Sequence, residues 1–174
     1  HWDGKARDWR PRAEYPIRNS PLSYLHIGSS SHPGLGDDHA CILRWHAPRK
    51  MTIEISGELE RPAVGKGRTG VNLTIHSSRN GVIHTSGLRV DQASVPVAIS
   101  GIEVEEGEMI HFIVDCDGDT SHDTYRWDPA ISNSDDPGER WKHSVDFAGP
   151  KSPLNARQAY AQALFNTNRF LFIR

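Results

Sequence analysis

The chain has 174 residues, of which 36% are hydrophobic and 24% charged, and 20 Lys and Arg against 22 Asp and Glu give a net charge of −2. This balance argues against a general nucleic-acid binder, and no apolar run approaches the roughly 20 residues that a membrane-spanning helix needs. The ten histidines make the charge depend on pH, because their protonation below about pH 6 turns the chain cationic.

The N-terminal part, residues 1–38, has Trp, Pro and Gly scattered among charged residues without a sustained period. We therefore expect an irregular segment that covers the neighbouring domain.

Residues 39–150 are dominated by alternating apolar and polar residues, the period of half-buried strands. Asn80-Gly81 is a strong hairpin signal, because both residues tolerate a positive φ. Short strands separated by turns are typical of an all-β fold, and we expect an antiparallel jelly-roll-like β-sandwich. The pattern predicts strands at 40–46, 51–56, 71–76, 82–86, 95–99, 102–104 and 110–114.

Residues 151–174 have a different pattern. Ser152-Pro153 is a favourable helix start, and apolar residues from Ala156 to Leu164 recur at helical spacing, which predicts one C-terminal helix. The end, Phe170 to Ile173, is strongly apolar and needs a partner surface.

The densest acidic cluster follows the 110–114 strand and contains Asp115, Asp117 and Asp119. Carboxylates at alternate positions of a Gly-containing loop can converge on a structural Ca²⁺. The spacing differs from that of a helix-loop-helix calcium loop, because Gly118 stands at the fourth position and Arg126 replaces the bidentate Glu. A solvated turn, with Asp side chains bonding local backbone NH groups, is the alternative.

The same end of the predicted sandwich carries the candidate ligand site, because Trp can stack on a sugar ring while polar neighbours bind its hydroxyls. Trp45 lies in a predicted strand, which favours a core position, whereas Trp2, Trp9 and Trp141 suit edge covering and ligand binding equally. The candidate ligand-binding residues are Trp127, Arg126, Asp123 and His122.

No catalytic residue is indicated, since nucleophile motifs and metalloprotease spacing are absent. Covalent haem attachment is excluded by the lack of a C-x-x-C-H motif. His76 and His84 flank the Asn-Gly turn, and two interpretations are open: facing zinc ligands or ordinary surface histidines. Cys41 and Cys116 fit either a disulfide or two buried free thiols.

Three stretches together resemble the C-terminal region of large planctomycete cytochrome-associated proteins, which carry planctomycete domains of unknown function. The first runs from His32-Pro33-Gly34 through Arg44-Trp45 to the 51–57 strand, and the second contains Phe112 to Gly118, Asp123, Trp127 and Pro129. The third starts at Asp146-Phe147-Ala148-Gly149-Pro150 and ends at Asn166 to Ile173, and the likeness spans about 26–174.

The resemblance implies an extracytoplasmic, carbohydrate-binding-like β-sandwich near the end of a multidomain polypeptide, with the C-terminal tail docked on the remaining domains. Tyr125, Arg169 and Cys41 depart from the family pattern. Since Cys41 stands where the family has an aliphatic residue, this departure favours a Cys41–Cys116 disulfide.

Together these features predict a non-catalytic module that binds polysaccharide or glycoconjugate. The alternative is a structural module that mediates interdomain or subunit contacts through its apolar end.

Overall fold

The computed structural model describes residues 1–147 of the chain, so the predicted C-terminal helix and apolar end lie outside the described residues. The regular secondary structure of the described part is mainly antiparallel strands, which confirms the all-β prediction. Its strands are β1 (Trp2–Asp3), β2 (Asp8–Trp9), β3 (Ile27–Gly28), β4 (Cys41–His46), β5 (Met51–Glu60), β6 (Val71–Ser77), β7 (Gly81–Leu88), β8 (Ser94–Val104), β9 (Met109–Cys116), β10 (Arg126–Trp127), β11 (Ala130–Asn133) and β12 (Arg140–Lys142).

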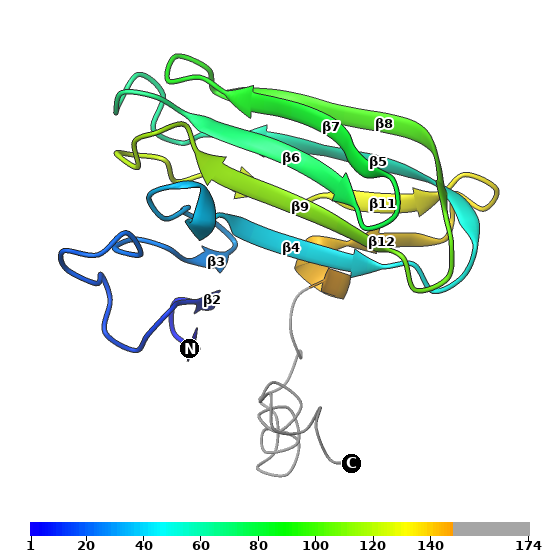
Figure 1. The fold of residues 1–174 in the computed structure, drawn as a ribbon, viewed down its shortest axis with the longest axis horizontal. Coiled ribbons are helices and arrows are strands. Elements are labelled where there is room, and N and C mark those ends of the chain that lie inside the picture. The colour runs from blue at the N-terminus through cyan, green and yellow to red at the C-terminus, as the bar shows by residue number, and fades with distance from the viewer. Residues whose placement is uncertain (148–174) are drawn as a thin grey trace, which may run out of the picture.

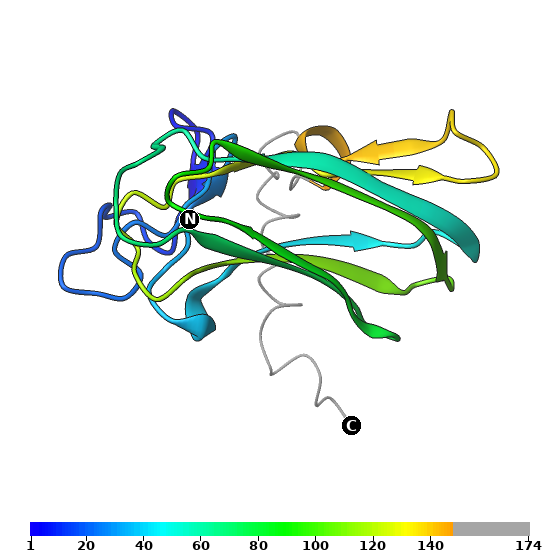
Figure 2. The ribbon, with the colours of Figure 1, turned by 90° about the horizontal axis from the view of Figure 1, so that it is seen from above.

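Two large sheets form the body of the molecule and lie in separate layers (Figure 2). A four-stranded sheet has the order β4-β9-β6-β7. A five-stranded sheet has the order β10-β5-β11-β12, with β8 pairing along the other side of β5. Because the chain crosses repeatedly between the layers, most neighbours within a sheet are not consecutive in sequence.

The core lies between the two layers and is built from every second residue of the long strands. Ile53 and Leu59 of β5, Leu73 and Ile75 of β6, and Phe112 of β9 are fully buried in one hydrophobic cluster. Each such side chain contributes about 1.5–3 kcal/mol when it leaves water. The period-two pattern therefore fixes which face of each strand turns inward.

The predicted turn at Asn80-Gly81 is present, since β6 and β7 form a hairpin and Gly81 has a φ of 75°. The stretches predicted separately as 95–99 and 102–104 are one strand, β8. Its pairing with β5 shifts register between Ile53 and Ile55, close to Gly101, whose φ is 72°. The apparent break in the alternation is thus a bulge within one strand.

The N-terminal segment, expected to be irregular, contains a small sheet of order β1-β2-β3 beside β4 (Figure 1). The rest of that segment joins the body through backbone hydrogen bonds: Ser31 N donates to Tyr125 O at 2.8 Å, and Tyr125 N donates to Ser31 O at 2.9 Å. A short 3₁₀ helix, Asp37–His39, leads into β4. A π-helical turn, η2 (His143–Phe147), ends the described chain.

Candidate functional site

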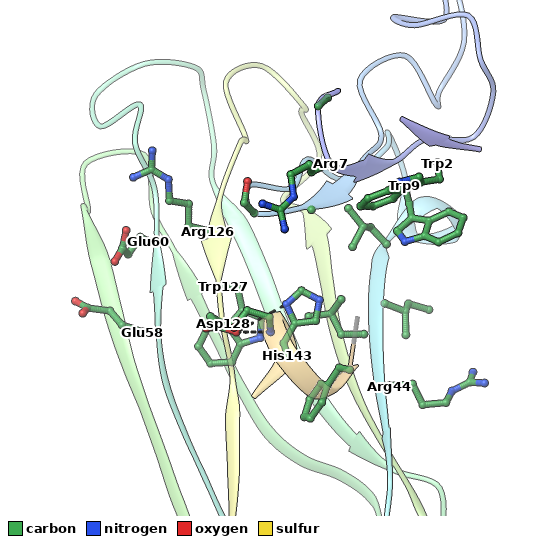
Figure 3. A pocket seen from close by; sticks show the side chains of 18 residues that line it. Trp2, Arg7, Trp9, Arg44, Glu58, Glu60, Arg126, Trp127, Asp128 and His143 are labelled. Carbon is green, nitrogen blue, oxygen red and sulfur yellow. Dashed lines mark hydrogen bonds and ion pairs between the residues drawn. The ribbon is translucent and has the colours of Figure 1, made fainter. Parts of the chain in front are cut away.

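A cleft of about 860 Å³ lies beside β4, the edge strand of the four-stranded sheet, and β10, the short edge strand of the other sheet. The N-terminal sheet forms one wall and η2 another. Figure 3 shows Trp2 and Trp9 on one side, Glu58, Glu60 and Arg126 on the opposite side, and Trp127, Asp128 and His143 between them.

The aromatic wall combines exposed and buried indoles. Trp2 and Trp9 pair across β1 and β2, are 45% and 44% exposed, and have ring centroids 5.3 Å apart at an interplanar angle of 53°. Trp127 is only 5% exposed and packs near Phe112, with ring centroids 6.4 Å apart. Its Nε1 donor is buried without an acceptor among residues 1–147. The exposed indoles therefore give the cleft an apolar, aromatic lining, and Trp127 contributes mainly to the core beneath it.

Charged side chains of both signs surround this aromatic wall. Arg126 of β10 pairs in register with Glu60 of β5, which places them next to each other on one face of the sheet. Glu58 lies two residues before Glu60, so its side chain projects to the same side. Arg7 enters from the turn between β1 and β2, where its φ is 57°. The cleft thus offers both donors and acceptors around the indoles.

Asp128 and the start of η2 form the floor of the cleft. The Asp128 carboxylate accepts hydrogen bonds from Ser144 N at 2.8 Å and Ser144 Oγ at 2.9 Å. Nδ1 of His143 lies 4.0 Å from Asp128 Oδ1. Burial lowers the pKa of His143, and the nearby Asp128 carboxylate opposes this effect. The imidazole is therefore mostly neutral at pH 7 and can both donate and accept.

The structure separates the four predicted ligand residues. Arg126 and Trp127 line the cleft, although Trp127 is mainly a core residue. His122 is exposed but does not line it, and Asp123 is fully buried. Since its side chain lies in the interior, Asp123 cannot reach a ligand at the surface.

Asp123 instead anchors loops to the body of the domain. Nη2 of Arg61 donates to Asp123 Oδ1 at 3.0 Å, and both side chains are 0% exposed. The same guanidinium donates to the carbonyls of Lys66 at 2.9 Å, Val90 at 3.0 Å and His122 at 3.3 Å. Burial raises the pKa of Asp123 to about 6, while Arg61 acts in the opposite direction. Asp123 therefore has a structural role, as the buried ion-pair partner of Arg61.

The predicted calcium ligands do not converge in the described residues. Asp115 accepts a hydrogen bond from Asn72 Nδ2 at 3.0 Å, and Asp119 accepts one from Ser121 N at 2.7 Å. The bond at Asp119 is of the local backbone type expected for a solvated turn. Within residues 1–147, no group of three or more His, Cys, Asp or Glu side chains is arranged to hold a metal ion.

Both cysteines are free, buried thiols in the structure. Cys41 of β4 pairs with Val114, so Cys116 lies two residues further along β9. The Cys41 thiol donates to the carbonyl of His32 at 3.3 Å. Burial raises its pKa to about 12, which keeps the thiol protonated.

His76 and His84 do not face each other. His84 pairs with Ile75, whereas His76 pairs with Val82 after a register shift, and cross-strand partners share a face of the sheet. The two histidines therefore project from opposite faces. His76 instead approaches His111, with ring centroids 5.9 Å apart.

Trp45 is buried in the core, as expected, with its ring centroid 5.3 Å from that of Trp141. Trp2 and Trp9, which the sequence left open between edge covering and binding, are the exposed indoles of the cleft.

No protein-family model matches the chain, and neither does any curated protein sequence. The planctomycete resemblance therefore stays a prediction. No helix in the described part of the chain is both long and apolar enough to cross a bilayer.

Proposed function

We propose that the protein is a non-catalytic carbohydrate-binding module and that the cleft beside β4 and β10 is its ligand site. The observation that carries this proposal is the pair of half-exposed indoles, Trp2 and Trp9, in a cleft of about 860 Å³. Adjacent exposed apolar side chains in a cleft are typical of ligand- and partner-binding sites. Sugar rings present flat CH faces that can cover them.

The polar lining supports the same function. A saccharide surrounds its CH faces with hydroxyls, which need donors and acceptors at the margin of an aromatic surface. Arg7 and Arg126 supply donors, and Glu58 and Glu60 supply acceptors.

The proposal includes a jelly-roll-like sandwich within a larger extracytoplasmic protein. The strand orders support this architecture, because neighbours such as β4 and β9 or β5 and β11 are distant in sequence, as Greek-key and jelly-roll sandwiches require. The extracytoplasmic setting rests on the sequence resemblance alone.

Affinity electrophoresis of the full chain through gels containing individual neutral and acidic polysaccharides tests the proposal. At least one polysaccharide is expected to retard the protein, and Trp2→Ala with Trp9→Ala is expected to abolish retardation. Tyr24→Ala is the matched control, because Tyr24 is a 53% exposed aromatic residue outside the cleft. The gels are run with and without Ca²⁺, since a calcium site was one interpretation of Asp115, Asp117 and Asp119.

Two results would contradict the proposal. Lack of retardation in every gel would exclude polysaccharide binding, and retention of binding by the double Trp variant would place the site elsewhere.

The alternative assembly function rests on the apolar sequence 170–173, which lies outside the described residues. That alternative would be favoured if the full chain sediments as an oligomer, if Phe170→Ser with Phe172→Ser dissociates this oligomer, and if no glycan binds.

A further inference from the structure

The outer face of the four-stranded sheet carries a row of basic side chains that begins at the cleft. Arg44 of β4 pairs with His111 of β9, and His111 pairs with His76 of β6. Cross-strand partners project from the same face about 4.5–5.5 Å apart, so the three groups form a regular line across the strands. Arg44 also lines the cleft, and Figure 3 shows its side chain pointing away from Trp127.

The contacts within this row are close. Nε of Arg44 donates to His111 Nδ1 at 3.4 Å, and the His111 and His76 rings meet edge to face at 5.9 Å. His46 lies on the same face of β4, two residues after Arg44, and is exposed. The row is therefore a cluster of cationic or protonatable groups at the surface.

Few negative groups balance this cluster. Along β4, β6, β7 and β9, Asp115 is the one carboxylate that projects from this face, and it accepts a hydrogen bond from Asn72. Partial burial lowers the pKa of His111, and Arg44, His76 and His46 lower it further. These groups thus repel one another when protonated, and an anion placed over them would relieve the repulsion.

We infer that the basic row binds a linear acidic polysaccharide, one that carries a carboxylate on successive sugars, and that this chain continues from the cleft across β4, β9 and β6. This inference rests on the proposed function, because the cleft supplies the first sugar contacts. Exposed Ile42 and partly buried Ile113 form the next row of the same face and offer apolar surface to sugar rings.

A polysaccharide fits this surface better than a nucleic acid. Apart from the imidazoles of the row, this face carries no Phe, Tyr or Trp along β4, β6, β7 and β9 on which bases could stack.

Polygalacturonate and its fully methyl-esterified form are matched probes, because they differ in the carboxylate charge. Calorimetric titration of the full chain at pH 5.5 and 7.5 is expected to show tighter binding of polygalacturonate at pH 5.5, and weaker binding as salt is added. Arg44→Gln, His76→Gln and His111→Gln are each expected to reduce affinity by about 1.5- to fivefold. Arg140→Gln, an exposed charge on β12, is expected to leave affinity unchanged.

The titration of His111 gives a second readout by NMR. Because binding and protonation are linked, polygalacturonate is expected to raise its pKa, whereas the methyl ester is not. Equal affinity for both forms, or an affinity independent of these three residues, would overturn the inference while leaving the cleft proposal intact. Equally tight binding of a single-stranded oligodeoxynucleotide would also overturn it. Failure of every polysaccharide, neutral or acidic, would refute the proposed function itself.

Discussion

Arg61 is the residue whose replacement should destabilise the fold most clearly. Its side chain is 0% exposed and pairs with the equally buried Asp123, so Arg61→Met leaves an unpaired carboxylate in the interior. Removing one partner of a buried ion pair typically costs about 3–5 kcal/mol. The loss also leaves the carbonyls of Lys66, Val90 and His122 without this donor. We therefore expect a decrease of about 3–5 kcal/mol in the free energy of unfolding at pH 7.

Urea unfolding followed by tryptophan fluorescence measures this decrease, and Arg140→Met, at an exposed position of β12, is the control with an expected change below about 0.5 kcal/mol. The double substitution Arg61→Met with Asp123→Leu also removes the unpaired acidic group, so it should recover part of the lost free energy of unfolding. A cost below about 1 kcal/mol for Arg61→Met, or a double variant less stable than the single one, would refute this reasoning.

Three further predictions concern neighbouring features. Burial raises the pKa of Asp123 to about 6 in the folded state, so the folded protein binds a proton at this carboxyl more tightly than the unfolded chain does. This proton-linked contribution to the free energy of unfolding is fully present below the unfolded pKa of about 3.9 and is lost as pH rises through 6. Because Asn does not titrate, the free energy of unfolding of Asp123→Asn, measured in urea, should increase relative to that of the native chain between pH 4 and 7. A relative decrease would show that Arg61, and not burial, has the larger effect on the pKa of Asp123. Gly67→Ala should lower the free energy of unfolding by about 2 kcal/mol or more in the same assay, because φ is 86° and the new Cβ would lie 2.1 Å from the Ser121 carbonyl oxygen. An unchanged urea midpoint would show that the loop rearranges to accommodate the methyl group. Mass spectrometry should detect iodoacetamide on Cys41 and Cys116 only after unfolding, without reductant, and a requirement for reductant would reveal a disulfide.

The sequence predicted the long strands because their burial is periodic. Alternation at β5, β6 and β9 reflects one buried face, and the Asn80-Gly81 turn carries a local backbone preference. The strands of the N-terminal sheet have only two residues each, which is too short for a period to appear. Their position depends on contacts with distant segments, such as the backbone pairing of Ser31 with Tyr125.

The candidate site was predicted only in part for a similar reason. Arg126 and Trp127 are adjacent in sequence, so a local pattern was sufficient to identify them together. Asp123 also belongs to that local pattern, but its partner Arg61 lies 62 residues away and determines its role. Trp2 and Trp9 join the cleft through tertiary packing, which composition alone does not encode.

The indole N–H signals of the protein's five tryptophans provide the most direct test of the cleft. In an NMR titration of the full chain with an oligosaccharide of whichever polysaccharide retards it, we expect the indole N–H signals of Trp2 and Trp9 to shift. Trp45, buried in the core, should keep its signal. Shifts confined to Trp45, or no movement of the Trp2 and Trp9 signals at saturating ligand, would contradict a glycan site beside the N-terminal sheet.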